Sequence, residues 1–262
     1  RSNDEQDDQT EEEESEQQQR RRRAFLSLLR VLKQPAESVG FVSSKAPAIR
    51  QIEKKAKREK KAVASLQELK TRLPTDLETP RYTVIARRKL YEVRLYDPFA
   101  VASFSISNTT RPANPRTDAA VSEPAKGNVK AFGALAGYLF GKNGGKIAMA
   151  MTSPVLMTDD DEGKTMSFVL PSKYWNKAAP KPLPGSGVQI HQVQADTRSV
   201  LMFGGYAVNV KERQSELLKL VNQDYEYQAV PGERPILAQY NDPFTPPWKR
   251  LNEVSIAVQP RS

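Results

Sequence analysis

Residues 128–170 read NVKAFGALAGYLFGKNGGKIAMAMTSPVLMTDDDEGKTMSFVL. Apolar residues recur there at three- and four-residue steps, the spacing of one face of a helix: Val129, Phe132, Leu135, Ala136 and Leu139. The helical pattern ends at Gly141, and residues 142–146 turn the chain. An extended segment and an acidic turn at 159–163 then lead to a strand at 165–170. This stretch therefore predicts one apolar helix followed by a β-hairpin.

Length and composition limit the kinds of protein that this chain can be. The 262 residues suggest one domain with an extension, and a net charge of +9 admits nucleic acid, anionic membranes or acidic small molecules as partners. The chain has no cysteine and one histidine, His191, which excludes disulfides, thiolate chemistry and histidine-cluster metal sites. No apolar run is long enough for a membrane-spanning helix. A chain that begins at Arg1 fits a removed targeting peptide or a trimmed terminus.

Residues 1–77 have a different composition from the rest of the chain. An acidic block is followed by a basic block, and such charged, weakly hydrophobic sequence favours disorder. Residues 45–72 carry ten Lys or Arg against three Glu. Two interpretations follow: a solvated tail, or an arm that docks on an acidic complex, an anionic membrane surface or RNA. No aromatic residues interleave with these basic residues, which argues against specific nucleic-acid recognition.

Residues 78–260 are expected to fold without the extension. Strands are predicted at 82–86, 90–96 and 99–106, a polar loop at 108–127, and then the central helix and hairpin. The second half repeats this order, with a strand pair at 188–193 and 200–203, a helix at 208–221, and strands at 225–230, 236–240 and 253–258. Two β-β-α-β-β units predict an α+β fold, a mixed sheet or open barrel that carries two helices.

Several blocks of the sequence resemble the SOUL/heme-binding protein family. The resemblance rests on Glu78-Thr-Pro-Arg-Tyr82, Tyr91-Glu-Val-Arg-Leu-Tyr96, Tyr138-Leu-Phe-Gly-Lys-Asn143, Met151-Thr-Ser-Pro-Val155, Ala238-Gln-Tyr-Asn-Asp-Pro243 and Arg250-Leu-Asn-Glu-Val254. The blocks stand in family order. The resemblance implies a distorted β-barrel built from a duplicated unit, with a tetrapyrrole-binding role and no shared catalysis. Plant and algal members are commonly plastid proteins, so we expect a chloroplast location, soluble or peripheral to thylakoids.

A porphyrin offers two apolar faces and an edge with two carboxylates, and a site must match both. Val129, Phe132, Ala136 and Leu139 are predicted to form an apolar platform, and Met149 and Met151 to add adaptable packing. Lys130, Lys142 and Lys146 flank this unit and are expected to meet the carboxylates. The alternative interpretation is that this helix face, Leu135 in particular, is core packed on the sheet.

The sequence does not predict a histidine axial ligand for heme iron, and methionine or tyrosine ligands stay open as alternatives. Some members of the family carry a histidine where this sequence has Leu95, and leucine cannot coordinate iron. His191 is predicted to be a solvated residue on a strand. Heme or another tetrapyrrole is therefore expected to be held weakly and reversibly, as suits a carrier, buffer or sensor. The alternative is a structural or docking subunit of a larger assembly, with no obligatory ligand.

Three other motifs do not support a catalytic or metal site. Residues 141–146 follow a helix, whereas a phosphate-binding loop follows a strand. Residues 159–162 lack the ligand spacing of a calcium loop and fit a solvated hairpin tip. A single histidine without a G-x-S-x-G motif argues against a serine hydrolase, so the protein is not expected to be an enzyme.

Overall fold

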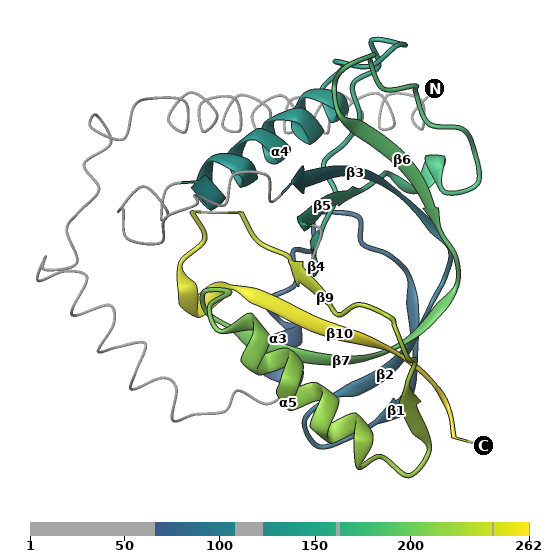
Figure 1. The fold of residues 1–262 in the computed structure, drawn as a ribbon, viewed down its shortest axis with the longest axis vertical. Coiled ribbons are helices and arrows are strands. Elements are labelled where there is room, and N and C mark those ends of the chain that lie inside the picture. The colour runs from purple at the N-terminus through teal and green to yellow at the C-terminus, as the bar shows by residue number, and fades with distance from the viewer. Residues whose placement is uncertain (1–65, 108–122, 161–162, 243, 262) are drawn as a thin grey trace, which may run out of the picture. The chain divides into compact units, whose positions relative to one another are not determined.

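The computed structural model describes residues 66–107, 123–160, 163–242 and 244–261 (Figure 1). Its strands are β1 Tyr82–Arg87, β2 Glu92–Tyr96, β3 Phe99–Ser107, β4 Val155–Asp160, β5 Gly163–Val169, β6 Val188–Val193, β7 Asp196–Gly204, β8 Tyr227–Ala229, β9 Ile236–Gln239 and β10 Leu251–Pro260. Its helices are α3 Leu66–Lys70, α4 Glu123–Leu139 and α5 Val210–Asn222, with short 3-10 turns η2 Ser172–Tyr174 and η3 Pro247–Lys249. None of the helices in these ranges has the length and apolar character needed to cross a membrane.

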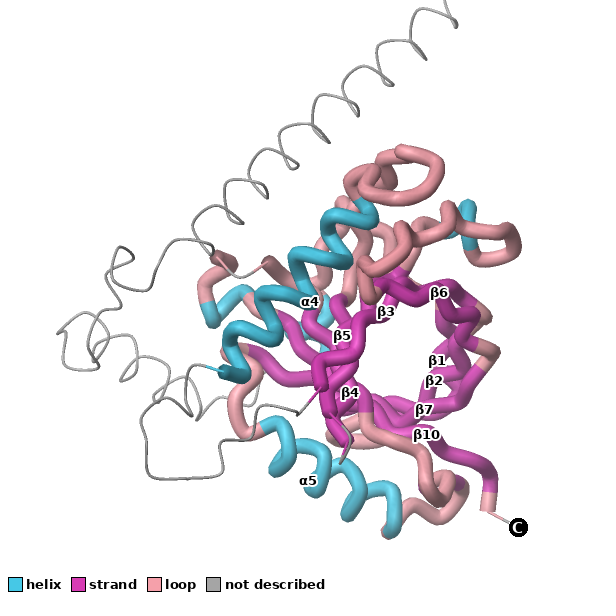
Figure 2. The backbone as a smooth tube through the Cα atoms, turned by 45° about the horizontal axis from the view of Figure 1, so that its top comes forward, coloured by secondary structure: helices cyan, strands magenta, loops and turns pink. Residues whose placement is uncertain are grey.

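The strands form one antiparallel sheet that curls into a barrel, seen along its axis in Figure 2. The strand order is β1-β2-β7-β10-β9-β4-β5-β3-β6, and β8 adds to β10. The two halves of the chain use equivalent pairings, since β3-β5-β4 in the first corresponds to β7-β10-β9 in the second. β4 and β9 join the halves, with Val155 opposite Gln239. The prediction of an α+β barrel from two β-β-α-β-β units is confirmed.

Two long, bent strands pair with each other as one ribbon and close the sheet into a barrel. β2 continues through Asp97-Pro98 into β3, and β6 continues through Gln194-Ala195 into β7. The register is the same on both sides of this corner, because Tyr96 lies opposite Asp196 and Phe99 opposite Val193. The predicted pairing of 188–193 with 200–203 is therefore wrong. β6 and β7 are two parts of one bent strand, and residues 194–195 lack the turn chemistry that reverses a chain.

The two helices cover the barrel from outside. α4 packs on β3, β5 and β6, and α5 packs on β10, β7 and β8. α4 begins at Glu123, so the prediction of a loop up to residue 127 is wrong for 123–127. Its opening Glu-Pro is a favourable helix start, because proline is tolerated in the first turn and an acidic residue suits the helix N-terminus. The prolines of this region had indicated a loop. The rest of the predicted loop lies outside the described residues.

The barrel has different residues on its two faces. Tyr91, just before β2, and Val93 of β2 lie under α5 with Leu217, Val221 and their neighbours. Glu92 and Arg94, which alternate with them, are buried on the opposite face. At one end of that inner face, Leu69 of α3 packs with Met202, Ala238, Tyr240 and Leu251. Lys70 of α3 lies 2.7 Å from the Glu92 carboxylate. The compact unit therefore extends beyond the boundary predicted at residue 77 and includes α3.

The packing of α3 predicts how the length of a fragment affects its stability. Leu69→Ala should lower the free energy of unfolding by about 2–5 kcal/mol, because it removes a buried apolar side chain. A fragment that starts at residue 78 should be less stable than one that starts at Ser65 by at least as much. Urea denaturation measures both, and Gln67→Ala, an exposed position of the same helix, is the matched control. Equal stability of all four proteins would show that α3 does not belong to the folded unit.

Candidate ligand-binding site

Charged residues fill the interior of the barrel around Arg94. Its Nε lies 3.1 Å from a Glu92 carboxylate oxygen and its Nη1 lies 2.9 Å from Glu253. Nη1 also lies 3.2 Å from the Tyr96 hydroxyl, and the guanidinium carbon stands 4.3 Å from the centre of the Tyr82 ring. The Tyr240 hydroxyl donates to the second Glu253 oxygen at 2.7 Å. We refer to these six residues and Lys70 as the Arg94 network.

The charges of the Arg94 network are paired with one another. Burial opposes the charged form of Arg94, but Glu253 and the surrounding tyrosine hydroxyls raise its pKa, so the guanidinium stays protonated. Burial also opposes ionisation of Glu92, yet hydrogen bonds from Lys70 and the charge of Arg94 lower its pKa. Two cations therefore balance two carboxylates. Each charge has a partner of opposite sign within the network.

The network also joins the sequence blocks that carry the family resemblance. The Ser153 backbone N–H donates to the Glu78 carbonyl at 2.9 Å, and its hydroxyl donates to the Tyr240 carbonyl at 3.0 Å. Tyr240 continues through Glu253 to Arg94. Sequence reasoning missed Glu92, Arg94 and Glu253 as a unit. The sequence feature that could have identified part of this unit is the two-residue spacing of Glu92 and Arg94 in a β-rich run. That spacing places both side chains on one face of a strand.

The predicted apolar platform on α4 becomes more buried toward its C-terminal end. Val129 and Phe132 are half-buried, and the Phe132 ring meets Phe168 edge-on at 5.2 Å between centroids. Ala136 and Leu139 are fully buried, as is Leu135 beside them. The core interpretation therefore describes the second half of this face, and only the first half offers surface to a ligand. The cofactor-binding role of these residues stays a prediction.

The predicted lysines all lie at the surface. Lys130, Lys142 and Lys146 are exposed. The aliphatic stem of Lys142 runs along α4 over Gly137, where an added Cβ would come within 3.2 Å of its Cδ. Lys146 has a left-handed backbone, φ 52°, in a loop that the buried Asn143 side chain holds through hydrogen bonds to the Ile147 N–H and carbonyl. Their positions suit contact with an anion at the end of α4.

The predicted methionines differ in burial. Met149 is 1% exposed and its N–H donates to the Leu139 carbonyl at 2.7 Å, so it is a core residue below the helix end. Met151 is half-buried.

The two positions considered for axial ligation lie on strands β6 and β2. His191 is exposed on β6, opposite Val101, as expected for a solvated strand residue. Leu95 is 41% exposed on β2, opposite Thr83 and Thr197. Within the described ranges, no three His, Asp or Glu side chains come together in a way that could hold a metal ion.

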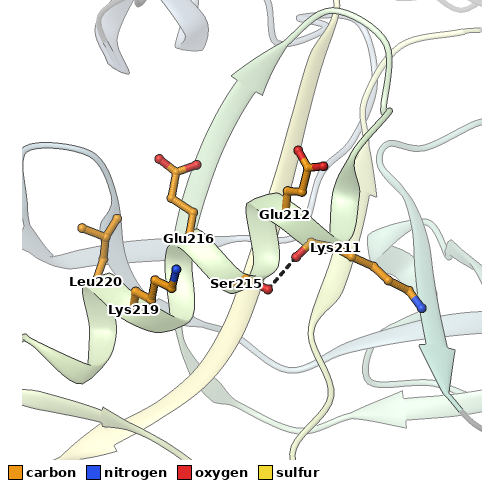
Figure 3. A pocket seen from close by; sticks show the side chains of 6 residues that line it. All are labelled: Lys211, Glu212, Ser215, Glu216, Lys219 and Leu220. Carbon is orange, nitrogen blue, oxygen red and sulfur yellow. Dashed lines mark hydrogen bonds between the residues drawn. The ribbon is translucent and has the colours of Figure 1, made fainter.

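A shallow depression lies on the outer face of α5, shown in Figure 3. Its lining is Lys211, Glu212, Ser215, Glu216, Lys219 and Leu220, with the Ser215 hydroxyl bonded to the Lys211 carbonyl of its own helix. Charges of both signs alternate along this surface, and every lining residue comes from α5. It has the character of a solvated helix face.

Comparison with known proteins agrees with this architecture. A family described as "SOUL heme-binding protein" matches residues 77–257. The match covers more than half of the chain, and the protein belongs to the SOUL heme-binding family. No curated protein sequence matches the chain.

The chain also has distant likenesses among solved structures. They include the EcmrR C-terminal domain (TM-score 0.43, 12% identity, covering 65% of this chain and 98% of that one) and a hydrolase from Listeria innocua (TM-score 0.42, 12% identity, 67% and 94%). A third is SAV2435 bound to tetraphenylphosphonium (TM-score 0.38, 13% identity, 64% and 93%).

The Arg94 network predicts a large effect of removing its cation. Arg94→Met leaves two buried carboxylates without their shared partner, so the free energy of unfolding should fall by about 3–5 kcal/mol. Adding Glu92→Gln and Glu253→Gln should recover part of the loss. Arg87→Met is the matched control, because Arg87 lies 3.6 Å from the same Glu92 but its side chain is 72% exposed, a setting worth about 0–1 kcal/mol. Similar effects of the two methionine variants in urea denaturation would contradict this account.

The buried tyrosines predict a loss of stability at alkaline pH. Burial and the nearby Glu253 raise the pKa of Tyr96 and Tyr240, so the folded state keeps protons that the unfolded state releases above about pH 10. The contribution of these two tyrosines to the free energy of unfolding should therefore be constant below that pH and fall as pH rises above it. Denaturant titrations at a series of pH values measure the slope, and tyrosinate absorbance should appear together with unfolding. Tyrosinate absorbance that developed fully before unfolding would contradict the prediction.

Proposed function

We propose that this protein is a non-catalytic tetrapyrrole-binding protein that acts as a carrier, buffer or sensor. The observation that carries the proposal is the family match over residues 77–257, since heme binding is the property by which that family is described. The Arg94 network adds support against catalysis, because its charged groups are paired with one another. Heme or a related tetrapyrrole would be held weakly and reversibly.

We place the ligand on the outer surface of α4, toward its N-terminal half. Val129 and Phe132 keep part of their apolar surface exposed, and Gly133 beside them has no side chain to hold a flat ring away from the helix. The buried Ala136, Leu139 and Met149 would then support the surface from below. A broad apolar ring in contact with such a patch is stabilised by the removal of apolar area from water.

Charge would orient the ligand on this surface. Lys130 lies beside Val129 in sequence, and Lys142 and Lys146 lie at the far end of α4, so cations stand at both ends of the apolar patch. Exposed ion pairs to propionates contribute little each, which fits reversible binding. With an exposed His191 and an aliphatic Leu95, we propose that iron is not coordinated by a histidine and that metal-free porphyrin binds as well.

We also propose a chloroplast location, soluble or peripheral to thylakoids, by analogy with plant and algal members of the family. The basic residues at 45–72 would dock on an acidic complex or an anionic membrane surface; most of them lie outside the described residues. Lys70, however, is engaged with Glu92 inside the barrel and Arg72 with Glu68, so the arm would be the part before α3.

Titration with hemin and with protoporphyrin, followed by Soret absorbance, tests the site. Val129→Asp should weaken both ligands at least about tenfold while the melting temperature changes little, because a charge at this half-buried position can still reach water but opposes an apolar ring. Leu218→Asp, an exposed apolar position on α5, is the matched control and should leave both affinities unchanged. Unchanged binding by Val129→Asp would exclude α4 as the platform.

Two further variants test the roles of charge and of iron. Replacing Lys142 and Lys146 by Ala should weaken hemin by roughly 0–1 kcal/mol and have less effect on a porphyrin with esterified propionates. His191→Ala should leave the affinity and the Soret band unaltered. A lost Soret shift in His191→Ala would instead establish a defined axial ligand and overturn the platform proposal.

A further inference from the structure

The surface around the C-terminal end of α4 carries only one sign of charge along long stretches of sequence. Residues 124–158 and 164–195 contain no Asp or Glu, although the chain as a whole has 31 acidic residues. In the structure these ranges supply most of α4, β5, β6 and two long loops. Six lysines in them are exposed: Lys130, Lys142, Lys146, Lys173, Lys177 and Lys181.

Two loops in these ranges lie side by side beyond the end of α4, where Figure 2 shows loops gathered next to β6. The Gly144 N–H donates to the Lys181 carbonyl at 2.8 Å, and Asn143 forms a β-bridge with Pro182. The Tyr138 hydroxyl, whose pKa burial raises to about 12, donates to the Pro180 carbonyl at 2.7 Å. We call residues 141–148 and 173–184 the paired loops. Their joined backbones hold their side chains in a fixed arrangement.

The paired loops also expose apolar side chains among the lysines. Ile147 and Leu183 are each 44% exposed. They are close along the joined backbone, because the Asn143 side chain bonds to the Ile147 backbone and Asn143 bridges the residue before Leu183. Glu78 is an acidic residue next to this surface. It accepts hydrogen bonds from the Ser172 N–H and hydroxyl at 2.9 and 2.6 Å, and Ser172 begins η2, the 3-10 turn that leads into the second loop. Its charge is thus partly engaged at the edge of the surface.

We propose that the paired loops are a membrane-contact surface that binds bilayers containing anionic lipids. Lysines near such a bilayer are attracted by its negative surface potential. Apolar side chains at the same surface enter the interfacial region and add burial, the combination by which peripheral proteins bind membranes. Charge alone would also suit an acidic protein, but exposed Ile147 and Leu183 on protruding loops favour a bilayer. This inference does not depend on tetrapyrrole binding.

Co-sedimentation of the full-length chain with vesicles tests the proposal. Phosphatidylcholine vesicles with phosphatidylglycerol should retain the protein, and phosphatidylcholine alone should not. Lys177→Glu with Lys181→Glu should weaken binding at least about tenfold, because charge reversal replaces attraction by repulsion. The matched control is Lys211→Glu with Lys219→Glu, the same charge change on the mixed-charge face of α5 drawn in Figure 3, which should bind as the original chain does.

A second pair of variants separates a bilayer from an acidic protein surface. Ile147→Ser with Leu183→Ser should also weaken binding to these vesicles, because it removes the apolar side chains without changing the charge. Thermal melting checks that each variant is folded, and none of the residues changed belongs to the proposed tetrapyrrole platform, so porphyrin titration should be unaffected. The proposal is overturned if the Lys177/Lys181 and Lys211/Lys219 variants lose vesicle binding equally, or if neither loses it. It is also overturned if the substitutions at Ile147 and Leu183 leave vesicle binding unchanged.

Discussion

The ion pairs of Arg94 are the interaction on which the rest of the barrel depends. A guanidinium with 1% of its side chain exposed lies between two carboxylates from strands at different places in the chain, Glu92 on β2 and Glu253 on β10. Lys70 extends the pairing to α3, and Tyr240 extends it to β9. Charges cannot be buried singly at acceptable cost, so these elements must assemble together. The inner face of the barrel thereby carries charges that are paired with one another.

Much of the architecture could be predicted from the sequence because periodicity reports which face of an element is buried. The strands of the first half and both helices were found within a few residues, and the duplicated order followed from them. Strand pairing was harder. The sequence of β6 and β7 has two strands near each other, the usual sign of a hairpin, and only the long ribbon with β2 and β3 shows that the chain bends without reversing.

The candidate site was predictable in part for a related reason. The spacing of Val129, Phe132, Ala136 and Leu139 identifies one stripe of α4, but the same spacing describes a face on the core and a face open to ligand. Only the burial of the side chains distinguishes a core face from a ligand face, and burial increases along the helix from half-buried Val129 to fully buried Leu139. Exposed lysines were easier to place, since a flexible charged side chain rarely lies anywhere but at the surface. The Arg94 network required knowledge of which strands are neighbours.

The bent ribbon has a consequence for how the chain folds as it is synthesised. Tyr96 pairs with Tyr82 in the first half but finds its second cross-strand partner only in Asp196, and β4 finds one of its neighbours only in β9. The first half of the barrel therefore has unpaired strand edges until the second half follows. Closing such distant contacts is slow, and open edges invite pairing with other chains in the meantime. The lysines of the first half would keep nascent chains apart by like-charge repulsion while the ribbon is incomplete.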